Sequence, residues 1–219
     1  VRDGMCMGLG SGSTAAIMLE LLGRRVREGL RVRGVPTSEM SRELAEREGI
    51  PIVGFDRVSR LDLTIDGADE VDPQLNVIKG GGGALLREKI VASLSRRVVI
   101  IVDSHKQVPQ LGAFPLPVEV VQFAWQPLAE RLGELGVQPV LRPGRDGRPL
   151  VTDEGNYILD CAFGRIDDPV ALAARLNAMP GVVDHGLFVG LAHTVVVGRG
   201  AGTVVIERDA NQEEADRKM

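Results

Sequence analysis

The first half of the chain alternates short runs of strand-forming residues with segments of helical periodicity. Such alternation is typical of a parallel sheet that is covered by helices on both faces. The strand-like runs are 5–9, 32–35, 61–65 and 98–102. Every side chain from Val98 to Val102 is apolar, as expected of a central parallel strand that is buried on both faces. We therefore expect an α/β domain with an open, mostly parallel sheet.

Helical signals lie between these strands. The expected helices carry apolar stripes, made of Ile17, Met18, Leu21 and Leu22 in the first and of Met40, Leu44 and Ala45 in the second. Thr37 or Ser38 is the expected N-cap of the second helix, and Gly49 is its expected end.

The pattern changes near Pro115. Further strands are expected at 116–123, 138–141, 157–162 and 182–189, with helices at 127–135 and 169–179. This β-α-β-β-α-β order is that of a ferredoxin-like α+β module. We expect the module to be a small domain (115–189) inserted into the α/β domain (1–114 and 190–219), whose sheet is completed by 194–197 and 203–206.

Composition excludes several classes of function. The net charge of −4 and the aromatic content of 3% disfavour nucleic-acid binding, which relies on basic surfaces and stacking rings. No apolar run approaches the ~20 residues that span a bilayer, and no signal-peptide pattern opens the chain. We therefore expect a cytoplasmic protein that has no membrane contact.

A few residues are expected to have structural roles only. Cys6 and Cys161 lie in apolar runs and are expected to be reduced packing residues. His105, His185 and His193 are scattered and are expected to be structural. The segment 207–219 is polar throughout, and any disorder is expected to be confined to it.

Polar segments directly follow the strands of the expected parallel sheet. These segments are 8–14, 37–38, 66–69 and 103–106. In an open α/β sheet, ligands bind in the crevice beyond the carboxyl ends of the strands. The sequence therefore predicts that a binding site forms there.

The glycine-rich segment 8–14 resembles a phosphate cradle at the start of a helix. Its amides and the hydroxyls of Ser11, Ser13 and Thr14 face the positive end of the helix dipole. The dinucleotide fingerprint requires glycine at position 13 and the Walker loop requires lysine there, but the residue at this position is serine. A dinucleotide or a nucleoside triphosphate is therefore disfavoured as the ligand. A single small phosphate is favoured, and the alternative is a tight turn capped by serine.

Two carboxylates and a lysine lie in the next polar segments. Asp66 and Asp69 fit the recognition of sugar hydroxyls better than a divalent cation, and the alternative is an Asx turn. Lys79 precedes the glycines 80–83 and could steady an oxyanion together with their amides, or be a solvated loop lysine. Lys106 either adds charge to a phosphate site or faces solvent.

Glu88 is the candidate general base. Its helical neighbours three and four positions away are Ala84, Leu85, Val91 and Ala92, while Leu86, Ile90 and Leu94 form a second apolar stripe. A glutamate on an apolar face loses water, which raises the carboxyl pKa towards the range that suits a base. The alternative is a solvated ion pair with Arg87 or Lys89.

Several motifs, in order along nearly the whole chain, resemble the ribose-5-phosphate isomerases of the A type. They are 10–15, 66–70, 79–82, 84–85, 87–89, 114–120, 151–153, 158–160, 180–183 and 186–188. One departure is Ser11, where the family often has threonine; either hydroxyl can donate a hydrogen bond. A larger departure is the absence of a helix before Met5, which in relatives adds a basic residue near the phosphate. We expect an N-terminal element to have been removed.

The resemblance implies an aldose–ketose isomerase of the pentose phosphate pathway that interconverts ribose 5-phosphate and ribulose 5-phosphate through an enediolate. Glu88 is then the base, Lys79 stabilises the enediolate, and Asp66 assists ring opening. The implied substrate contacts are Ser11, Gly12, Ser13, Thr14, Asp66, Gly67, Ala68, Asp69, Lys79, Gly80, Gly81, Gly82 and Lys106.

No cofactor and no metal are expected to be required, and a homo-oligomer (a dimer or tetramer) is implied. The alternatives are a non-catalytic sugar-phosphate sensor and an acyl-CoA transferase-like enzyme of related fold.

Overall fold

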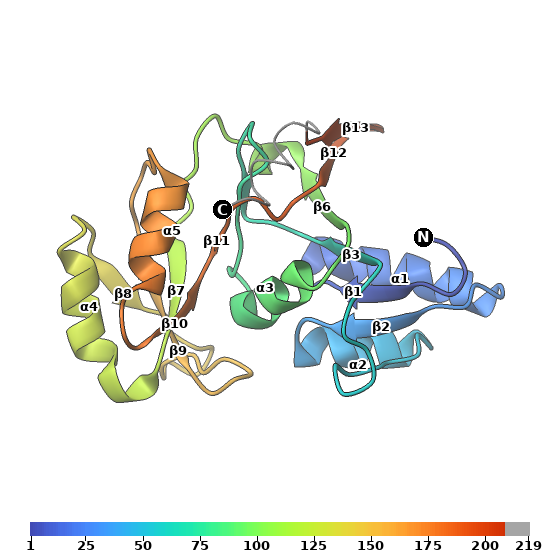
Figure 1. The fold of residues 1–219 in the computed structure, drawn as a ribbon, viewed down its shortest axis with the longest axis horizontal. Coiled ribbons are helices and arrows are strands. Elements are labelled where there is room, and N and C mark those ends of the chain that lie inside the picture. Colours follow the sequence, from blue (N-terminus) through green and yellow to red (C-terminus); the bar gives the residue numbers. More distant parts are fainter. Residues whose placement is uncertain (209–219) are drawn as a thin grey trace. The chain divides into compact units, whose positions relative to one another are not determined.

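The computed structural model describes residues 1–208, and 209–219, most of the polar end segment, lie outside the described residues. The chain forms two compact units (Figure 1). Unit 1 comprises 1–67, 87–105 and the chain from 190 onwards, and unit 2 comprises 68–86 and 106–189. Both this division and the predicted one separate 189 from 190, but the structure groups 68–86 and 106–114 with the smaller module.

Unit 1 is built on a six-stranded sheet in the order β13-β12-β6-β3-β1-β2. All neighbouring strands pair in parallel except β12 and β13, which are antiparallel. This confirms the expected open, mostly parallel sheet and the return of the chain to it near its end. The strands are β1 (Cys6–Leu9), β2 (Arg33–Pro36), β3 (Leu63–Asp66), β6 (Val98–Asp103), β12 (Thr194–Arg199) and β13 (Gly202–Glu207).

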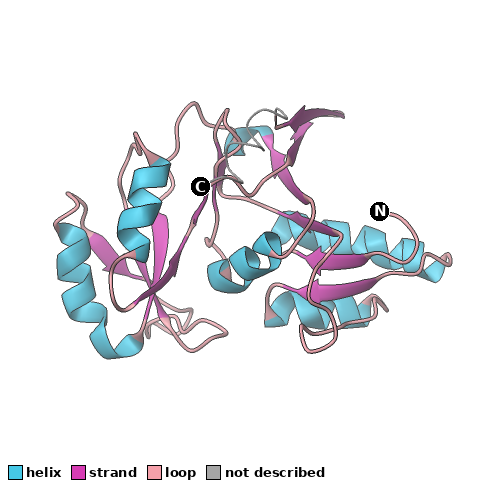
Figure 2. Cartoon of the chain, viewed as in Figure 1, coloured by secondary structure: helices cyan, strands magenta, loops and turns pink. Residues whose placement is uncertain are grey.

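Helices cover both faces of this sheet (Figure 2). Alternate residues of a strand point to opposite faces, and β1 shows this directly. Met7 and Leu9 pack with residues of α1 (Ser13–Arg27) and α2 (Glu39–Arg47), whereas Cys6 packs in a second cluster with Val91 of α3 (Leu85–Ser93). The chain passes from unit 2 into unit 1 within α3.

The predicted apolar stripes of α1 and α2 are partly wrong. The buried face of α1 is formed by Ala15, Leu19 and Leu22, while Ile17 and Leu21 are 61% and 52% exposed. Ala15, Leu19 and Leu22 follow a spacing of three and four, and Ile17 lies off that face. Met40 of α2 is likewise exposed. The predicted N-cap is confirmed at Ser38, whose Oγ accepts a hydrogen bond from Ser41 N at 3.0 Å.

Unit 2 contains the predicted ferredoxin-like order. Its antiparallel sheet has the order β10-β7-β9-β8, and its core joins this sheet to α4 and α5. The elements are β7 (Leu116–Val120), a 3-10 turn η2 (Gln122–Ala124), α4 (Trp125–Gly133), β8 (Pro139–Leu141), β9 (Tyr157–Cys161), α5 (Pro169–Asn177) and β10 (Val182–His185).

A second, three-stranded sheet in unit 2 was not predicted. It has the order β11-β5-β4, with β4 (Glu70–Val71), β5 (Val77–Ile78) and β11 (Leu187–Phe188). The predicted strand 182–189 is therefore divided at Gly186, whose N–H donates to Pro117 O at 2.7 Å and whose carbonyl accepts from Lys79 N at 2.9 Å. A Cβ at this position would lie 2.3 Å from Lys79 O, so only glycine fits. A short 3-10 turn, η1 (Ser104–Lys106), completes the described elements.

Cys6 and Cys161 are buried free cysteines, as predicted, and burial raises the pKa of the Cys161 thiol to about 12. Within residues 1–208, no helix combines the length and the apolar character needed to cross a bilayer.

Glu119 on β7 is a buried acid with an incomplete set of hydrogen bonds. Its Oε1 accepts from Thr152 Oγ1 at 2.8 Å and Asn156 Nδ2 at 3.0 Å, but Oε2 is buried without a partner among the described residues. Burial raises the pKa of this carboxyl above its ordinary value of 4.5, and the nearby Asp184 and Glu154 act in the same direction.

The expected result is a pH-dependent effect of Glu119→Gln on the free energy of unfolding. Because native Glu119 keeps its proton to a higher pH than the unfolded chain, its contribution is fully present below pH 4.5 and is lost as the pH rises through the native pKa. Wild type should therefore lose stability relative to the variant above pH 4.5. Chemical denaturation of both proteins across this range tests it, and a pH-independent difference would contradict it.

Candidate active site

The loop between β1 and α1 presents uncapped backbone donors. Gly12, with φ of +90°, is the N-cap of this 15-residue helix, and no side chain among the described residues makes a capping hydrogen bond there. Ser13 and Thr14 are exposed, and the first turn contains no acidic residue. The first amides of α1 and the positive end of its dipole are thus available to an anion.

Asp66, at the end of β3, fixes the shape of this loop. Its Oδ1 accepts from Ser11 N at 3.0 Å and from Gly67 N at 2.8 Å, and the side chain is 2% exposed. Gly10 makes this approach possible, because a Cβ there would lie 2.3 Å from Asp66 Oδ1 and 2.6 Å from Asp66 Cα. Unit 1 therefore brings together the predicted residues Ser11, Gly12, Asp66 and Gly67.

We expect Gly10→Ala to destabilise the protein and to weaken phosphate binding. The added methyl group must displace Asp66 and the loop amides, and overpacking of this kind costs about 1–3 kcal/mol. Thermal unfolding and titration with inorganic phosphate measure the two effects. Gly133→Ala is the matched control, since no heavy atom lies within 4 Å of its Cβ position and the change should be neutral or slightly stabilising. Equal effects of the two substitutions would contradict the prediction.

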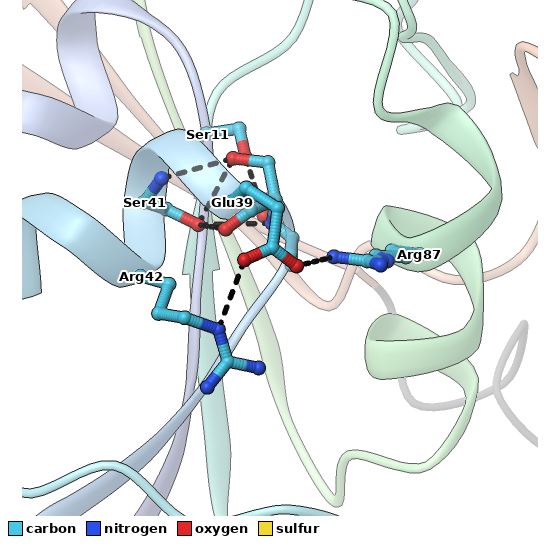
Figure 3. Close-up of polar contacts among 7 residues, drawn as sticks. Ser11, Glu39, Ser41, Arg42 and Arg87 are labelled. Carbon is cyan, nitrogen blue, oxygen red and sulfur yellow. Dashed lines mark hydrogen bonds and ion pairs between the residues drawn. The ribbon is translucent and has the colours of Figure 1, made fainter. Parts of the chain in front are cut away.

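A network of hydroxyl groups beneath the loop was missed by sequence reasoning. Ser11 Oγ lies 2.6 Å from Thr37 Oγ1 and 2.8 Å from Ser38 Oγ, and Ser38 Oγ lies 3.1 Å from Ser41 Oγ. Figure 3 labels Ser11 and Ser41, the two ends of this network. Thr37 in turn donates to Leu9 O at 3.0 Å. The Ser11 hydroxyl thus joins the loop to the start of α2. The available signal was the position of Thr37 and Ser38 directly after a strand.

The loop also borders a pocket of unit 1 with a volume of about 360 Å³. The loop contributes Gly10, Gly12 and Ser13 to its lining, and Ser41 and Arg47 line it from α2. This volume is in the range of small-molecule sites. The rest of the lining comes from α1 and α2, so the pocket lies beside the loop and between these two helices, and Asp66, Lys79 and Glu88 are not among its lining residues.

Glu88 is buried within α3, as the apolar spacing predicted. It is 6% exposed, and its neighbours Leu85, Val91 and Ala92 are also buried. The second predicted stripe is the outer one, because Ile90 and Leu94 are exposed. The alternative reading, in which Glu88 lies on a solvated face, is contradicted by this burial.

Arg87, next to Glu88, connects the start of α3 to α2. Its Nη1 donates to Glu39 Oε1 at 2.6 Å, and Glu39 also lies 3.2 Å from Arg42 (Figure 3). The hydrogen bond from Arg87, aided by Arg42, lowers the pKa of Glu39 below its ordinary value. This carboxylate therefore stays charged to a lower pH than an isolated glutamate. Sequence reasoning did not anticipate this bridge, since α2 and α3 are far apart along the chain.

In unit 2, Lys79 is a buried lysine. It is 3% exposed, and its Nζ lies 5.7 Å from the centroid of the Phe188 ring, within the range of a cation–π contact. This contradicts the alternative of a solvated loop lysine. A lysine shielded from water interacts more strongly with a nearby negative charge than an exposed one.

Asp69 contacts the glycine loop, which we define as residues 79–83. Its backbone N–H donates to Ile78 O at 2.7 Å, and its Oδ2 accepts from Gly81 N at 2.8 Å. Asp69 thus orders this loop, a role not predicted for it. Two other predicted contact residues, Ala68 and Lys106, are half-buried in unit 2.

Two of the three histidines accept backbone hydrogen bonds. His193 Nδ1 accepts from Val98 N at 3.1 Å, and His185 Nδ1 accepts from Leu187 N at 3.2 Å, which fits their expected structural roles. Across residues 1–208, no group of three or more His, Cys, Asp or Glu side chains is arranged to hold a metal ion.

Comparison with known proteins agrees with these features. Residues 33–202 match the family model of ribose 5-phosphate isomerase A, also called phosphoriboisomerase A. The ribose-5-phosphate isomerase A of Nitrobacter hamburgensis is 54% identical over 214 residues, which cover 95% of this chain and 92% of the relative.

Solved structures agree as well. Ribose 5-phosphate isomerase A from Methanocaldococcus jannaschii superposes with a TM-score of 0.90 at 42% identity, covering 94% of this chain and 92% of that one. A D-ribose-5-phosphate isomerase in complex with phospho-erythronic acid gives a TM-score of 0.92, also at 42% identity, covering 95% and 93%. With a family model over most of its length and relatives above half identity, the chain belongs to the ribose 5-phosphate isomerase A family.

Proposed function

We propose that this protein interconverts ribose 5-phosphate and ribulose 5-phosphate, with Glu88 as the base that moves a proton between C2 and C1. The observation that carries the proposal is the burial of Glu88 on the inner face of α3, in a chain of the isomerase A family. A carboxylate held away from water is a stronger base than an exposed one.

The chemistry requires a base and a stabiliser of negative charge. In the open-chain aldose, the hydrogen on C2 is acidic because it lies next to the C1 aldehyde. Its removal gives an enediolate, and return of the proton to C1 gives the ketose. A positioned base contributes roughly 10²–10⁴ in rate. No electrons are exchanged with an outside partner, so the reaction requires no redox cofactor, and in this proposal Lys79 and the glycine amides supply the charge stabilisation that a Lewis-acid metal would otherwise give.

We assign the sugar phosphate's phosphoryl group to the start of α1. Ser11, Gly12, Ser13 and Thr14 supply amides and hydroxyls there, and the uncapped helix end favours an anion. Lys106 adds positive charge for the same group. The assignment to the start of α1 is supported by the exposed, donor-rich loop and by the pocket beside it, and the role of Lys106 rests on membership of the family.

We assign the enediolate to Lys79 and the amides of Gly80 and Gly82, whereas the third predicted amide, that of Gly81, donates to Asp69 Oδ2 and holds the loop in shape. A buried ammonium group and preorganised N–H groups act strongly on a developing oxyanion. Asp66 assists ring opening. Asp69, with the adjoining Gly67 and Ala68, contacts the sugar hydroxyls.

The direct test is to incubate the protein with ribose 5-phosphate, without added metal, and to follow ribulose 5-phosphate. We expect conversion, with deuterium from D₂O entering the product because the proton passes through a base. Binding without conversion would instead indicate a sensor. Inertness towards the sugar combined with reaction of a coenzyme A ester would indicate a transferase.

We further propose that the enzyme is a cytoplasmic homo-oligomer of the pentose phosphate pathway. Membership of a family of sugar-phosphate isomerases supports this. Sedimentation analysis that shows a mass of 23.5 kDa alone would contradict self-association.

A further inference from the structure

One side chain from a distant part of unit 2 holds two carbonyl groups of the glycine loop. Arg142 directly follows β8, 62 residues after Gly80. Its Nη1 donates to Gly80 O at 2.7 Å and to Gly81 O at 3.2 Å. Its Nε and Nη2 donate to the two carboxylate oxygens of Asp160 on β9 at 2.9 and 2.5 Å. The guanidinium thus links the glycine loop to the antiparallel sheet.

The pair is shielded from water. The side chains of Arg142 and Asp160 are 11% and 24% exposed. A buried ion pair often contributes little net stability, because removing both charges from water is costly. The contribution of this pair is geometric. The planar guanidinium donates two parallel hydrogen bonds to a carboxylate along one edge, and its remaining N–H groups reach the loop carbonyls. A lysine has no such planar arrangement of donors.

The hydrogen bonds from Arg142 fix the direction of two consecutive peptide groups, those that begin with the Gly80 and Gly81 carbonyls. The Gly80 carbonyl accepts a hydrogen bond from Arg142, and the Gly81 N–H of the same peptide group donates to Asp69 Oδ2 at 2.8 Å. Both the carbonyl and the N–H of this peptide group are therefore held in place. In the next peptide, the Gly81 carbonyl also points to Arg142. Because the peptide is trans, the Gly82 N–H points the opposite way. Gly82 is exposed, and its Cβ position has no heavy atom within 4 Å.

We infer that Arg142 is a positioning residue that turns the Gly82 N–H towards the oxyanion of the reacting sugar. The inference rests on the proposed function, in which the glycine amides stabilise the enediolate. Arg142 itself touches only protein groups in this role. Asp160 orients the guanidinium, and Asp69 holds the loop from the other side.

The test compares Arg142→Met and Arg142→Lys with the wild type. A small displacement of a catalytic donor can cost up to roughly 100-fold in rate, so we expect kcat to fall on the order of 10–100-fold with KM little changed. Affinity for phospho-erythronic acid, whose carboxylate mimics the planar charge of an enediolate, should fall with kcat. Arg142→Lys should not restore the rate. Arg165→Met is the control, because the Arg165–Asp167 pair is 72% and 76% exposed, and it should retain wild-type kinetics.

A second readout does not depend on turnover. Amide hydrogen exchange at Gly81 should be faster in Arg142→Met, since the peptide loses one of its three hydrogen bonds and keeps those from Gly83 N to Gly80 O and from Gly81 N to Asp69 Oδ2. Should that variant fail to fold, Asp160→Asn keeps the volume, removes the charge that orients the guanidinium, and should lower kcat in the same direction. Wild-type kcat in both Arg142 variants, or unchanged Gly81 exchange, overturns the inference. If the wild type converts ribose 5-phosphate and Glu88→Gln does not, a negative result for Arg142 leaves the proposed function intact. An inactive wild type would overturn both the proposed function and the inference about Arg142.

Discussion

Replacing Glu88 with glutamine is expected to lower kcat by at least ~100-fold while KM changes little. Glutamine has nearly the same size and keeps the packing against Leu85 and Val91, but it cannot accept the C2 proton. Substrate contacts outside the reacting carbons remain. Steady-state kinetics with ribose 5-phosphate, together with thermal unfolding, provide the measurement.

Glu20→Gln is the matched control for this change. Glu20 is an exposed glutamate of α1 in the same unit, so its replacement alters net charge equally and should leave kcat unchanged. Near-normal turnover of Glu88→Gln would remove Glu88 from the role of base. A loss of activity explained by unfolding would show up as a lowered melting temperature, which we do not expect from an isosteric change.

Replacing Lys79 with methionine is expected to lower kcat by roughly 10²–10³, equivalent to about 2.7–4 kcal/mol of transition-state stabilisation. Methionine fills a similar volume beside Phe188 but carries no charge to place near the enediolate. Because the interaction strengthens as charge develops, the loss should appear in kcat more than in KM. Affinity for phospho-erythronic acid should fall in parallel.

Arg131→Met serves as the control for Lys79→Met. It removes one positive charge from an exposed position of α4 in the same unit and should have no kinetic effect. A Lys79 variant whose kcat stays within a few-fold of wild type would exclude the ammonium group as the main stabiliser. A rise in KM alone would assign Lys79 to ground-state binding instead.

Local patterns were sufficient for much of the fold and for several site residues. The uninterrupted apolar run at 98–102 predicted a central strand, and β6 (Val98–Asp103) occupies that position between β3 and β12. The neighbours of Glu88 three and four positions away predicted its burial, because helical geometry places those residues on one face. The β-α-β-β-α-β order likewise followed from turn signals and periodicity alone.

Other features depended on residues that are far apart along the chain. The run 182–189 has the composition of one strand, yet it divides at Gly186 because the backbone of Lys79 and Pro117 occupies the space there. Ile17 and Met40 fit a helical apolar stripe, but their exposure depends on which face of each helix meets the sheet. Periodicity identifies an apolar face without fixing what covers it.

The residue types in the glycine-rich segments and around Glu88 were enough to predict a small-phosphate site, an oxyanion partner and a base, and the resemblance to a known family implied the isomerase reaction. The hydrogen bonds of Arg142 to Gly80, and of Asp66 to Ser11, could be found only in the folded protein. Such contacts join positions 62 and 55 residues apart, and they form only when long loops close and tertiary packing brings the groups together.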